Sequence, residues 1–262
     1  LLRLSNPPLN PLSHHVRAGI MEGLFRAQSD KAISCVVITG AGKAFSAGAD
    51  IKEMADAHAV LRKPTLTAVV AAIEDCSRPV VAAINGVALG GGCEVALACH
   101  FRVASPNASM GLPEVLIGLL PGAGGTQRLP RLVEAKVALD MTTTGKMVPA
   151  NKALSFGLVD HVVGSADADL VGAAALFAQQ RLLEANLDCF RCKNLPLKDT
   201  PTTVLAVCEA ASAEIGPPVR GKEAAWACVE ALRAAVLQRG GGGCFTSGMA
   251  EEGRLFSKVG QT

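Results

Sequence analysis

The 262-residue chain contains no tyrosine, one tryptophan and eight phenylalanines, so that aromatic residues make up only 3% of it. Proteins that bind single-stranded nucleic acid stack bases on aromatic side chains, and this composition argues against that class. The formal net charge is +2, and no dense run of lysine and arginine provides the positive surface that polyanions require. We therefore expect no nucleic-acid partner.

The chain also lacks long apolar runs. Its longest uncharged stretch, Pro79 to Cys93, includes Asn85 and several glycines and falls short of the roughly 18 residues of a membrane-spanning helix. No basic segment followed by an apolar one opens the sequence, and the final Gln-Thr is not a peroxisomal address. We expect no membrane span, and no targeting signal is visible in this chain.

Metal-binding patterns are missing as well. The five histidines are scattered, without the spacing of metal ligands. Cys189 and Cys192 form a lone CxxC with no second pair and no histidine nearby. The nine cysteines are mostly in apolar surroundings, which is typical of buried free thiols in a reducing compartment. We expect no metal site.

Half of the residues are hydrophobic, which is ample for a core. Apolar, β-branched runs at 32–39 and 79–84 are typical of strands covered on both faces. Strands that alternate with helices indicate an α/β fold. Further strands are expected at 101–104 and 158–163, with helices at 13–30, 51–76, 92–99, 123–156 and 166–185. An interruption is expected at Pro64, and turns are expected at Gly145 and Pro149.

The composition changes after about residue 190. Three alanine-rich or amphipathic stretches, 200–214, 221–238 and 249–259, predict an all-helical second segment. A run of glycines at 240–243 separates the last two and is expected to be a flexible link.

Two segments share one pattern. Residues 36–50 (VVITGAGKAFSAGAD) and 80–94 (VVAAINGVALGGGCE) each read as a strand, a glycine-rich loop and an acidic residue that opens a helix. Such a corner directs backbone N–H groups outward at a helix start, where they favour negative charge. The two corners could converge on one oxygen atom; the alternative is two ordinary tight turns.

The glycine-rich loops do not fit other known sites. Gly40-Ala-Gly42 follows a strand, but Phe45 stands where a dinucleotide fingerprint has its third glycine. No P-loop and no Gly-x-Ser-x-Gly elbow is present. A nicotinamide-dependent oxidoreductase and a serine hydrolase are both disfavoured.

Two glutamates stand out. Glu94 follows the triple glycine 90–92 within VALGGGCEVALAC, and Glu114 is the only charged residue between Arg102 and Arg128. An acid in apolar company is either partnered in a core or kept reactive by burial, which raises its pKa toward the range useful for proton transfer. Two such acids beside backbone N–H donors would suit proton transfer next to a carbonyl.

Three motifs carry a family resemblance: FSAGADIKEM (45–54), AAINGVALGGGCEVALACHFRVAS (82–105) and GLPEVLIGLLPGAGGTQRLPRLV (111–133). Together they resemble the enoyl-CoA hydratase/isomerase (crotonase) family over roughly residues 1–190. The resemblance implies a ββα spiral core. Residues 191–262 are similar to the helical segment that follows the hydratase part in the peroxisomal bifunctional members, where a dehydrogenase half comes next. The resemblance to these members also implies a peroxisomal location.

The resemblance further implies an activity, the hydration of trans-2-enoyl-CoA to 3-hydroxyacyl-CoA in fatty acid β-oxidation, with Δ3,Δ2-enoyl-CoA isomerisation as a second reaction. The only partner implied is the acyl-CoA thioester, with no cofactor beyond the coenzyme A of the substrate. The implied site residues are the catalytic acids Glu94 and Glu114, the oxyanion-hole amides of Ala49 and Gly91, and the substrate contacts Ala47, Ile51, Lys52 and Gly122.

Within this resemblance Glu94 would act as base toward water, Glu114 would deliver a proton to the α carbon, and the Gly122 N–H would help to hold the water. The alternative is a non-catalytic acyl-CoA-binding fragment or paralogue of the same fold. Assembly stays open between a monomer and a trimer or hexamer, and the acyl chain length is not determined.

Overall fold

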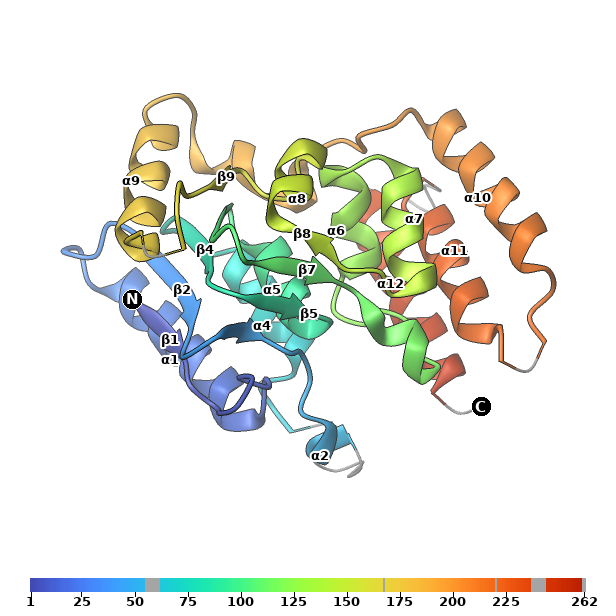
Figure 1. The fold of residues 1–262 in the computed structure, drawn as a ribbon, viewed down its shortest axis with the longest axis horizontal. Coiled ribbons are helices and arrows are strands. Elements are labelled where there is room, and N and C mark those ends of the chain that lie inside the picture. Colours follow the sequence, from blue (N-terminus) through green and yellow to red (C-terminus); the bar gives the residue numbers. More distant parts are fainter. Residues whose placement is uncertain (55–61, 167, 220, 237–243, 261–262) are drawn as a thin grey trace.

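The computed structural model describes residues 1–54, 62–166, 168–219, 221–236 and 244–260. Its centre is a five-stranded, all-parallel sheet in the order β1-β2-β4-β6-β9 (Figure 1). Every residue of β2, β4 and β6 is buried, as the apolar runs predict. The strands are β1 (Leu2–Leu4), β2 (Val36–Gly40), β4 (Val80–Ile84), β6 (Phe101–Ala104) and β9 (His161–Val162).

A second, four-stranded sheet lies beside the first and has the order β3-β5-β7-β8. It corrects two sequence-based predictions, because residues 40–50 and 85–92 were expected to be loops. Its strands are short and rich in small residues, and that composition hides them from a pattern search. They are β3 (Ala44–Ser46), β5 (Val87–Leu89), β7 (Ser109–Gly111) and β8 (Val148–Pro149).

The two sheets are built by one repeated step. Each of β2, β4 and β6 is followed directly by a strand of the second sheet, β3, β5 and β7, and then by a helix or helical turn. The chain therefore winds as a ββα spiral, which confirms the predicted fold class. Because β3 and β5 pair in parallel, their carboxyl ends meet at one edge, and the glycine-rich segments follow there.

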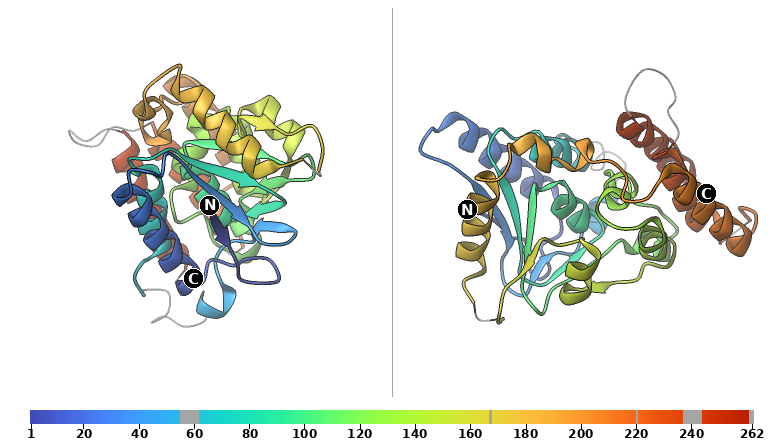
Figure 2. Two further views of the ribbon diagram at one scale, coloured as in Figure 1. Left: turned by 90° about the vertical axis from the view of Figure 1, so that its left-hand side faces the viewer. Right: turned by 90° about the horizontal axis from the view of Figure 1, so that it is seen from above.

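Helices cover both faces of the large sheet (Figures 1 and 2). The main core contains apolar residues of α1 (His14–Ser29), α4 (Leu66–Glu74) and α5 (Gly91–Ala98). On the opposite face α9 (Leu170–Leu182) packs on β4 and β6, where the Phe101 and Phe177 rings lie edge to face at 5.8 Å. The segment 51–76 is helical at α2 (Ile51–Met54) and α4, while residues 55–61 lie outside the described part.

The predicted helix 123–156 is divided into three: α6 (Gly125–Leu132), α7 (Ala135–Thr144) and α8 (Ala150–Phe156). The expected turns at Gly145 and Pro149 are present, and a further break occurs at Val133 and Glu134, both with extended ψ angles. In the described part of the chain, three short 3-10 helices complete the core region: η1 (Pro113–Ile117), η2 (Leu187–Phe190) and η3 (Cys192–Asn194).

The C-terminal region is helical as predicted, with α10 (Pro201–Ile215), α11 (Glu223–Ala234) and α12 (Cys244–Val259). Figure 1 shows these helices beside α6 and α7. An apolar cluster joins Cys228 of α11 and Leu255 of α12 to Leu120, which lies just before the glycine turn 122–125. The expected link at 240–243 lies outside the described residues, and the division into domains 1–190 and 191–262 stays a prediction.

Of the eight cysteines whose side chains are described, six are buried, Cys35 is half-buried and Cys189 is exposed, and all eight are free thiols. No cluster of three potential metal ligands is found in this part of the chain. Among its helices, none combines the length and apolarity needed to cross a bilayer.

Candidate functional site

The two glycine-rich corners meet in space. Gly48, after β3, has φ +96°, and a Cβ added to it would lie 2.7 Å from the Leu89 carbonyl oxygen and 3.2 Å from the Gly91 nitrogen. A side chain would be strained by the backbone angle and would clash with the second corner. The sequence therefore requires glycine at this point so that the ends of β3 and β5 can lie against each other.

Two backbone amides, those of Ala49 and Gly91, lie beside this junction. A Cβ at Gly91 would lie 3.5 Å from the Ala49 nitrogen, so both amides belong to one small region. Neither amide has a hydrogen-bond acceptor among the described residues. Gly91 is the first residue of α5, where the helix dipole adds positive potential. Such a pair of N–H donors is suited to a developing oxyanion.

Glu94 lies in the first turn of α5, a helix of which all eight residues are buried. Its Oε1 accepts hydrogen bonds from the Ala123 amide at 2.7 Å and the Gly125 amide at 2.9 Å. Burial raises the pKa of Glu94, although these two amides and the Arg128 charge lower it. The carboxylate is thus held in place by the turn that precedes α6.

Glu114 lies in η1, which Pro113 opens. Its carboxylate rests on Gly90, since a Cβ there would be 3.2 Å from Oε1, and Gly90 has φ +51°. Oε2 is buried without a partner in the described structure. Burial, the nearby Glu94 charge and the Glu252 charge raise the pKa of Glu114 well above its ordinary value.

The two acids are close but electrostatically unequal. Glu94 stays ionised more readily than Glu114, because two amides and the Arg128 charge favour its carboxylate form. Glu114 has no such donors on Oε2 and faces another acid, so it holds a proton to higher pH. Two neighbouring carboxyl groups with pKa values pushed apart can act as base and acid respectively.

A buried ion pair supports the turn. Arg128 of α6 binds Glu74 of α4, with Nη2 to Oε2 at 2.7 Å, and both side chains are almost fully buried. Its Nη1 also donates to the Ala123 carbonyl oxygen at 3.1 Å. Ala123 therefore donates its amide to Glu94 and is also held through its carbonyl oxygen by Arg128.

Sequence reasoning missed a third buried acid, Glu252 of α12. Its Oε1 accepts from the Gly124 amide at 2.7 Å and its Oε2 from the Thr126 amide at 3.1 Å. It binds the same turn as Glu94, although 158 positions separate the two glutamates in sequence. Its spacing from Met249, Leu255 and Phe256 was the available signal, because residues three or four apart share one helix face.

The expected substrate contacts are more dispersed. Ala47 is half-buried and its amide donates to the Leu9 carbonyl oxygen, while Lys52 is exposed on α2. The Ile51 side chain lies outside the described part. Gly122 is covered by the Phe256 ring, since a Cβ added to this glycine would lie 2.7 Å from the ring. Their roles toward coenzyme A and water stay predictions.

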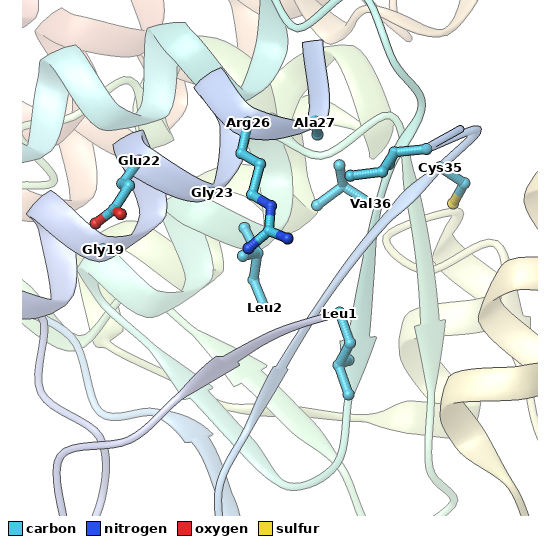
Figure 3. Close-up of a pocket in the computed structure, with 10 residues that line it drawn as sticks. Leu1, Leu2, Gly19, Glu22, Gly23, Arg26, Ala27, Cys35 and Val36 are labelled. Atoms are coloured by element: carbon cyan, nitrogen blue, oxygen red, sulfur yellow. The ribbon is translucent and has the colours of Figure 1, made fainter. Parts of the chain in front are cut away.

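A separate cavity of about 410 Å³ lies between α1 and the start of β1 and β2. Figure 3 shows Arg26 reaching from α1 toward Leu2 within it. None of the ten residues that line it is a predicted site residue. The cavity is therefore distinct from the glutamate site.

Comparison with known proteins agrees with this arrangement. Residues 1–200 match the family model described as enoyl-CoA hydratase/isomerase. The peroxisomal bifunctional enzyme of Danio rerio is 42% identical over 99% of this chain, which spans about a third of that relative's length (34%). DspI of Pseudomonas aeruginosa is 37% identical, with a TM-score of 0.65, over 73% of this chain and 79% of its own.

An enoyl-CoA hydratase from Bacillus anthracis is 28% identical, with a TM-score of 0.58, over 99% of this chain and 86% of its own. The match of the family model covers well over half of the chain. On this evidence the chain belongs to the enoyl-CoA hydratase/isomerase family.

Proposed function

We propose that this chain hydrates trans-2-enoyl-CoA to 3-hydroxyacyl-CoA, with Glu94 as base, Glu114 as acid and the Ala49 and Gly91 amides as the oxyanion hole. The observation that carries the proposal is the inequality of the two glutamates. Glu94 accepts two amide hydrogen bonds, whereas Glu114 has a buried oxygen with no partner in the described structure.

The reaction follows from this arrangement. Glu94 takes a proton from water while the water oxygen forms a bond to C3 of the enoyl group. The C2–C3 π electrons move toward the thioester, so that negative charge develops on its oxygen and is stabilised by the Ala49 and Gly91 amides. Glu114 then donates its proton to C2, and the charge collapses back to the carbonyl. The substrate gains one water, and the proton now on Glu94 must return to Glu114, directly or through solvent, before the next turnover.

The magnitudes are adequate for catalysis. One well-placed oxyanion donor typically lowers the barrier by about 2.7–4 kcal/mol. Each positioned acid or base contributes about 10²–10⁴-fold. Catalysis by both acids and both amides also accounts for why buried, unsatisfied polar groups are retained at this point of the fold, where each costs stability.

Isomerisation makes a smaller demand. Moving a proton from C2 to C4 of a 3-enoyl-CoA needs one carboxyl group rather than two, and that group must begin as the carboxylate so that it can take the proton from C2. Glu114 has the unpartnered oxygen for it and serves in its ionised form. We place both reactions in fatty acid β-oxidation and in the peroxisome, because relatives that match nearly the whole chain are named peroxisomal bifunctional enzymes. No cofactor beyond the coenzyme A of the substrate is proposed.

The test is a hydration assay, read as loss of enoyl absorbance, with short, medium and long trans-2-enoyl-CoA. We expect turnover by the full chain and a loss of about 10²–10⁴-fold in Glu94→Gln and in Glu114→Gln, since each removes one proton-transfer group. With a 3-enoyl-CoA, Glu94→Gln is expected to keep more of its activity than Glu114→Gln.

Glu251→Gln is the matched control, because Glu251 pairs with Arg254 on the surface of α12 and should leave turnover unchanged. Near-wild-type hydration by either site variant would refute the mechanism. Tight binding of crotonyl-CoA without any change in its enoyl absorbance would instead support the non-catalytic alternative.

A further inference from the structure

Four successive amides before and within the first turn of α6 are shared between two glutamates. Ala123 and Gly125 donate to Glu94, and Gly124 and Thr126 donate to Glu252. The acceptor therefore alternates from one amide to the next: Glu94, Glu252, Glu94 and Glu252. Displacing one carboxylate must therefore disturb the amides that bind the other.

Glu252 is fully buried and well satisfied. Besides the two amides, it accepts from the Thr126 hydroxyl, with Oγ1 to Oε2 at 2.5 Å. Thr126 Oγ1 in turn accepts from Gln127 Nε2 at 2.9 Å. Three donors fix both oxygens of a side chain that comes from the last described helix.

The helix that carries Glu252 is itself anchored on α6. The Phe245 ring lies under the Arg128 and Arg131 guanidinium groups, at 5.1 and 5.0 Å from its centroid. Farther along α12, Leu255 is buried in the apolar cluster and the Phe256 ring covers Gly122. These contacts lie on both sides of Glu252 along α12 and fix the backbone from which its side chain extends.

We propose that Glu252 is a positioning residue for the proton transfer: by holding the Gly124 and Thr126 amides, it keeps the Ala123 and Gly125 amides directed at Glu94. The inference rests on the proposed hydratase function. It makes the C-terminal helix part of the active site, although no atom of Glu252 needs to touch the substrate.

Glu252 also adds charge to the site. The titratable and charged groups around it in the described structure are Glu94 of α5, Glu114 of η1, Cys228 of α11, and Arg128 of α6, which lies against Gly124. Burial and the Glu94 charge raise the pKa of Glu252 to about 8, against the lowering effect of its three donors. Its own charge raises the pKa of Glu114. Removing it should therefore let Glu114 lose its proton at lower pH.

Glutamine is the informative replacement. A glutamic acid side chain can accept both amides whether it is ionised or carries one proton directed at Thr126 Oγ1. A glutamine must turn an NH₂ group toward either the Gly124 or the Thr126 amide, which places donor against donor. The shape of the side chain is kept. One of the two amide hydrogen bonds to the turn is lost, and so is the negative charge.

The experiment measures kcat, KM and the pH profile of crotonyl-CoA hydration by the full chain. In Glu252→Gln we expect kcat to fall by about 10–100-fold, because a catalytic group misplaced by an ångström can lose about 10²-fold, with little change in KM. The alkaline limb of the profile should move to lower pH. Thr126→Val, which keeps the Thr126 amide but removes the hydroxyl that donates to Glu252 and accepts from Gln127 Nε2, should move the limb in the same direction by less.

Two variants separate positioning from general loosening. Glu251→Gln removes the neighbouring charge on the exposed side of α12, and Leu255→Ala weakens the packing of α12 without removing a hydrogen bond to Glu252. Neither should move the alkaline limb. A wild-type kcat and limb in Glu252→Gln would overturn the inference, and so would equal losses in Glu252→Gln and Leu255→Ala with both limbs unmoved.

If Glu252→Gln does not fold, Thr126→Val decides, and an unmoved limb in that variant overturns the inference. A wild-type chain without hydratase activity is a separate result, because it refutes the proposed function itself. An active wild type whose Glu94→Gln variant is inactive, beside a normal Glu252→Gln, refutes only the role of Glu252.

Discussion

At the scale of single residues, the site depends on places where a side chain is missing. Gly90 combines φ +51° with a Cβ position 3.2 Å from Glu114 Oε1. It allows the chain to turn from β5 into α5 and lets the carboxylate of Glu114 lie against the backbone. Glycines in the two glycine-rich corners thus permit backbone angles and close contacts next to Glu94 and Glu114 that a side chain would prevent.

Gly90→Ala tests this close approach. The added methyl group is expected to displace the Glu114 carboxylate and to lower kcat for hydration by about tenfold or more, because catalytic groups misplaced by an ångström lose up to 10²-fold. The sparsely populated backbone conformation of Gly90, φ +51° and ψ −125°, costs about 1–3 kcal/mol in addition, measured by thermal or urea unfolding.

Gly221→Ala is the control for backbone strain. Gly221 has φ +88° and open space where a Cβ would be, so this variant should lose similar stability and keep its turnover. If both variants kept wild-type kcat, close packing of Glu114 on Gly90 would not matter for the reaction.

Residue-scale prediction from sequence succeeded where an acid stands among apolar neighbours and failed where it shares a helix with other charges. Glu94 and Glu114 are conspicuous in VALGGGCEVALAC and MGLPEVLIGLLPGAGG. Glu252 follows Glu251 in MAEEGRLF and resembles a solvated helix face. Only the register with Leu255 and Phe256 separates the two, and its partners, Gly124 and Thr126, are too distant in sequence to be inferred.

At the scale of secondary-structure elements, strong apolar periodicity predicted the large sheet and most helices. The strands of the second sheet were missed, because Ala44–Ser46 and Val87–Leu89 lie within glycine-rich segments of small residues. Their strand conformation comes from pairing with each other rather than from local propensity. The same pairing brings together the two glycine-rich corners after β3 and β5. From the sequence, their meeting was only one of two alternatives.

The elements around the site are tied by the Arg128–Glu74 ion pair, which joins α6 to α4. We expect Arg128→Met to destabilise the fold by about 3–5 kcal/mol, because it leaves the Glu74 carboxylate buried without its partner. Denaturant unfolding measures this loss, and hydration should fall as well, since the Ala123 carbonyl loses a donor.

The double variant Glu74→Leu/Arg128→Met is the comparison. Replacing both charges by apolar side chains should recover much of the lost stability. Additive destabilisation in the double variant would show that the pair is not coupled and that another contact of Arg128 explains its effect.

At the scale of the whole molecule, the chain forms a spiral core whose last helix returns to the site. Figure 2 shows α10 to α12 gathered on one side of the core. The apolar cluster of Leu120, Cys228 and Leu255 connects these helices to the segment between Glu114 and the glycine turn. The sequence predicts the C-terminal segment only as a helical addition. In the structure it packs against Leu120 and binds the glycine turn that donates to Glu94.

The pH dependence of the whole reaction follows from the two glutamates. Glu94 acts as base, so activity should fall at low pH as it gains a proton. Glu114 acts as acid, so activity should fall at high pH as it loses one. Since burial raises both pKa values, and the Glu94 charge raises that of Glu114 further, the bell should lie above the ordinary glutamate range near pH 4.3.

The measurement that tests the central claim most directly is the pH profile of kcat/KM for crotonyl-CoA hydration by the full chain. The account predicts a bell with its maximum well above pH 4.3 and an alkaline limb that reports Glu114. A maximum within the ordinary glutamate range with loss of activity by neutral pH, or no hydration at any pH, would contradict it.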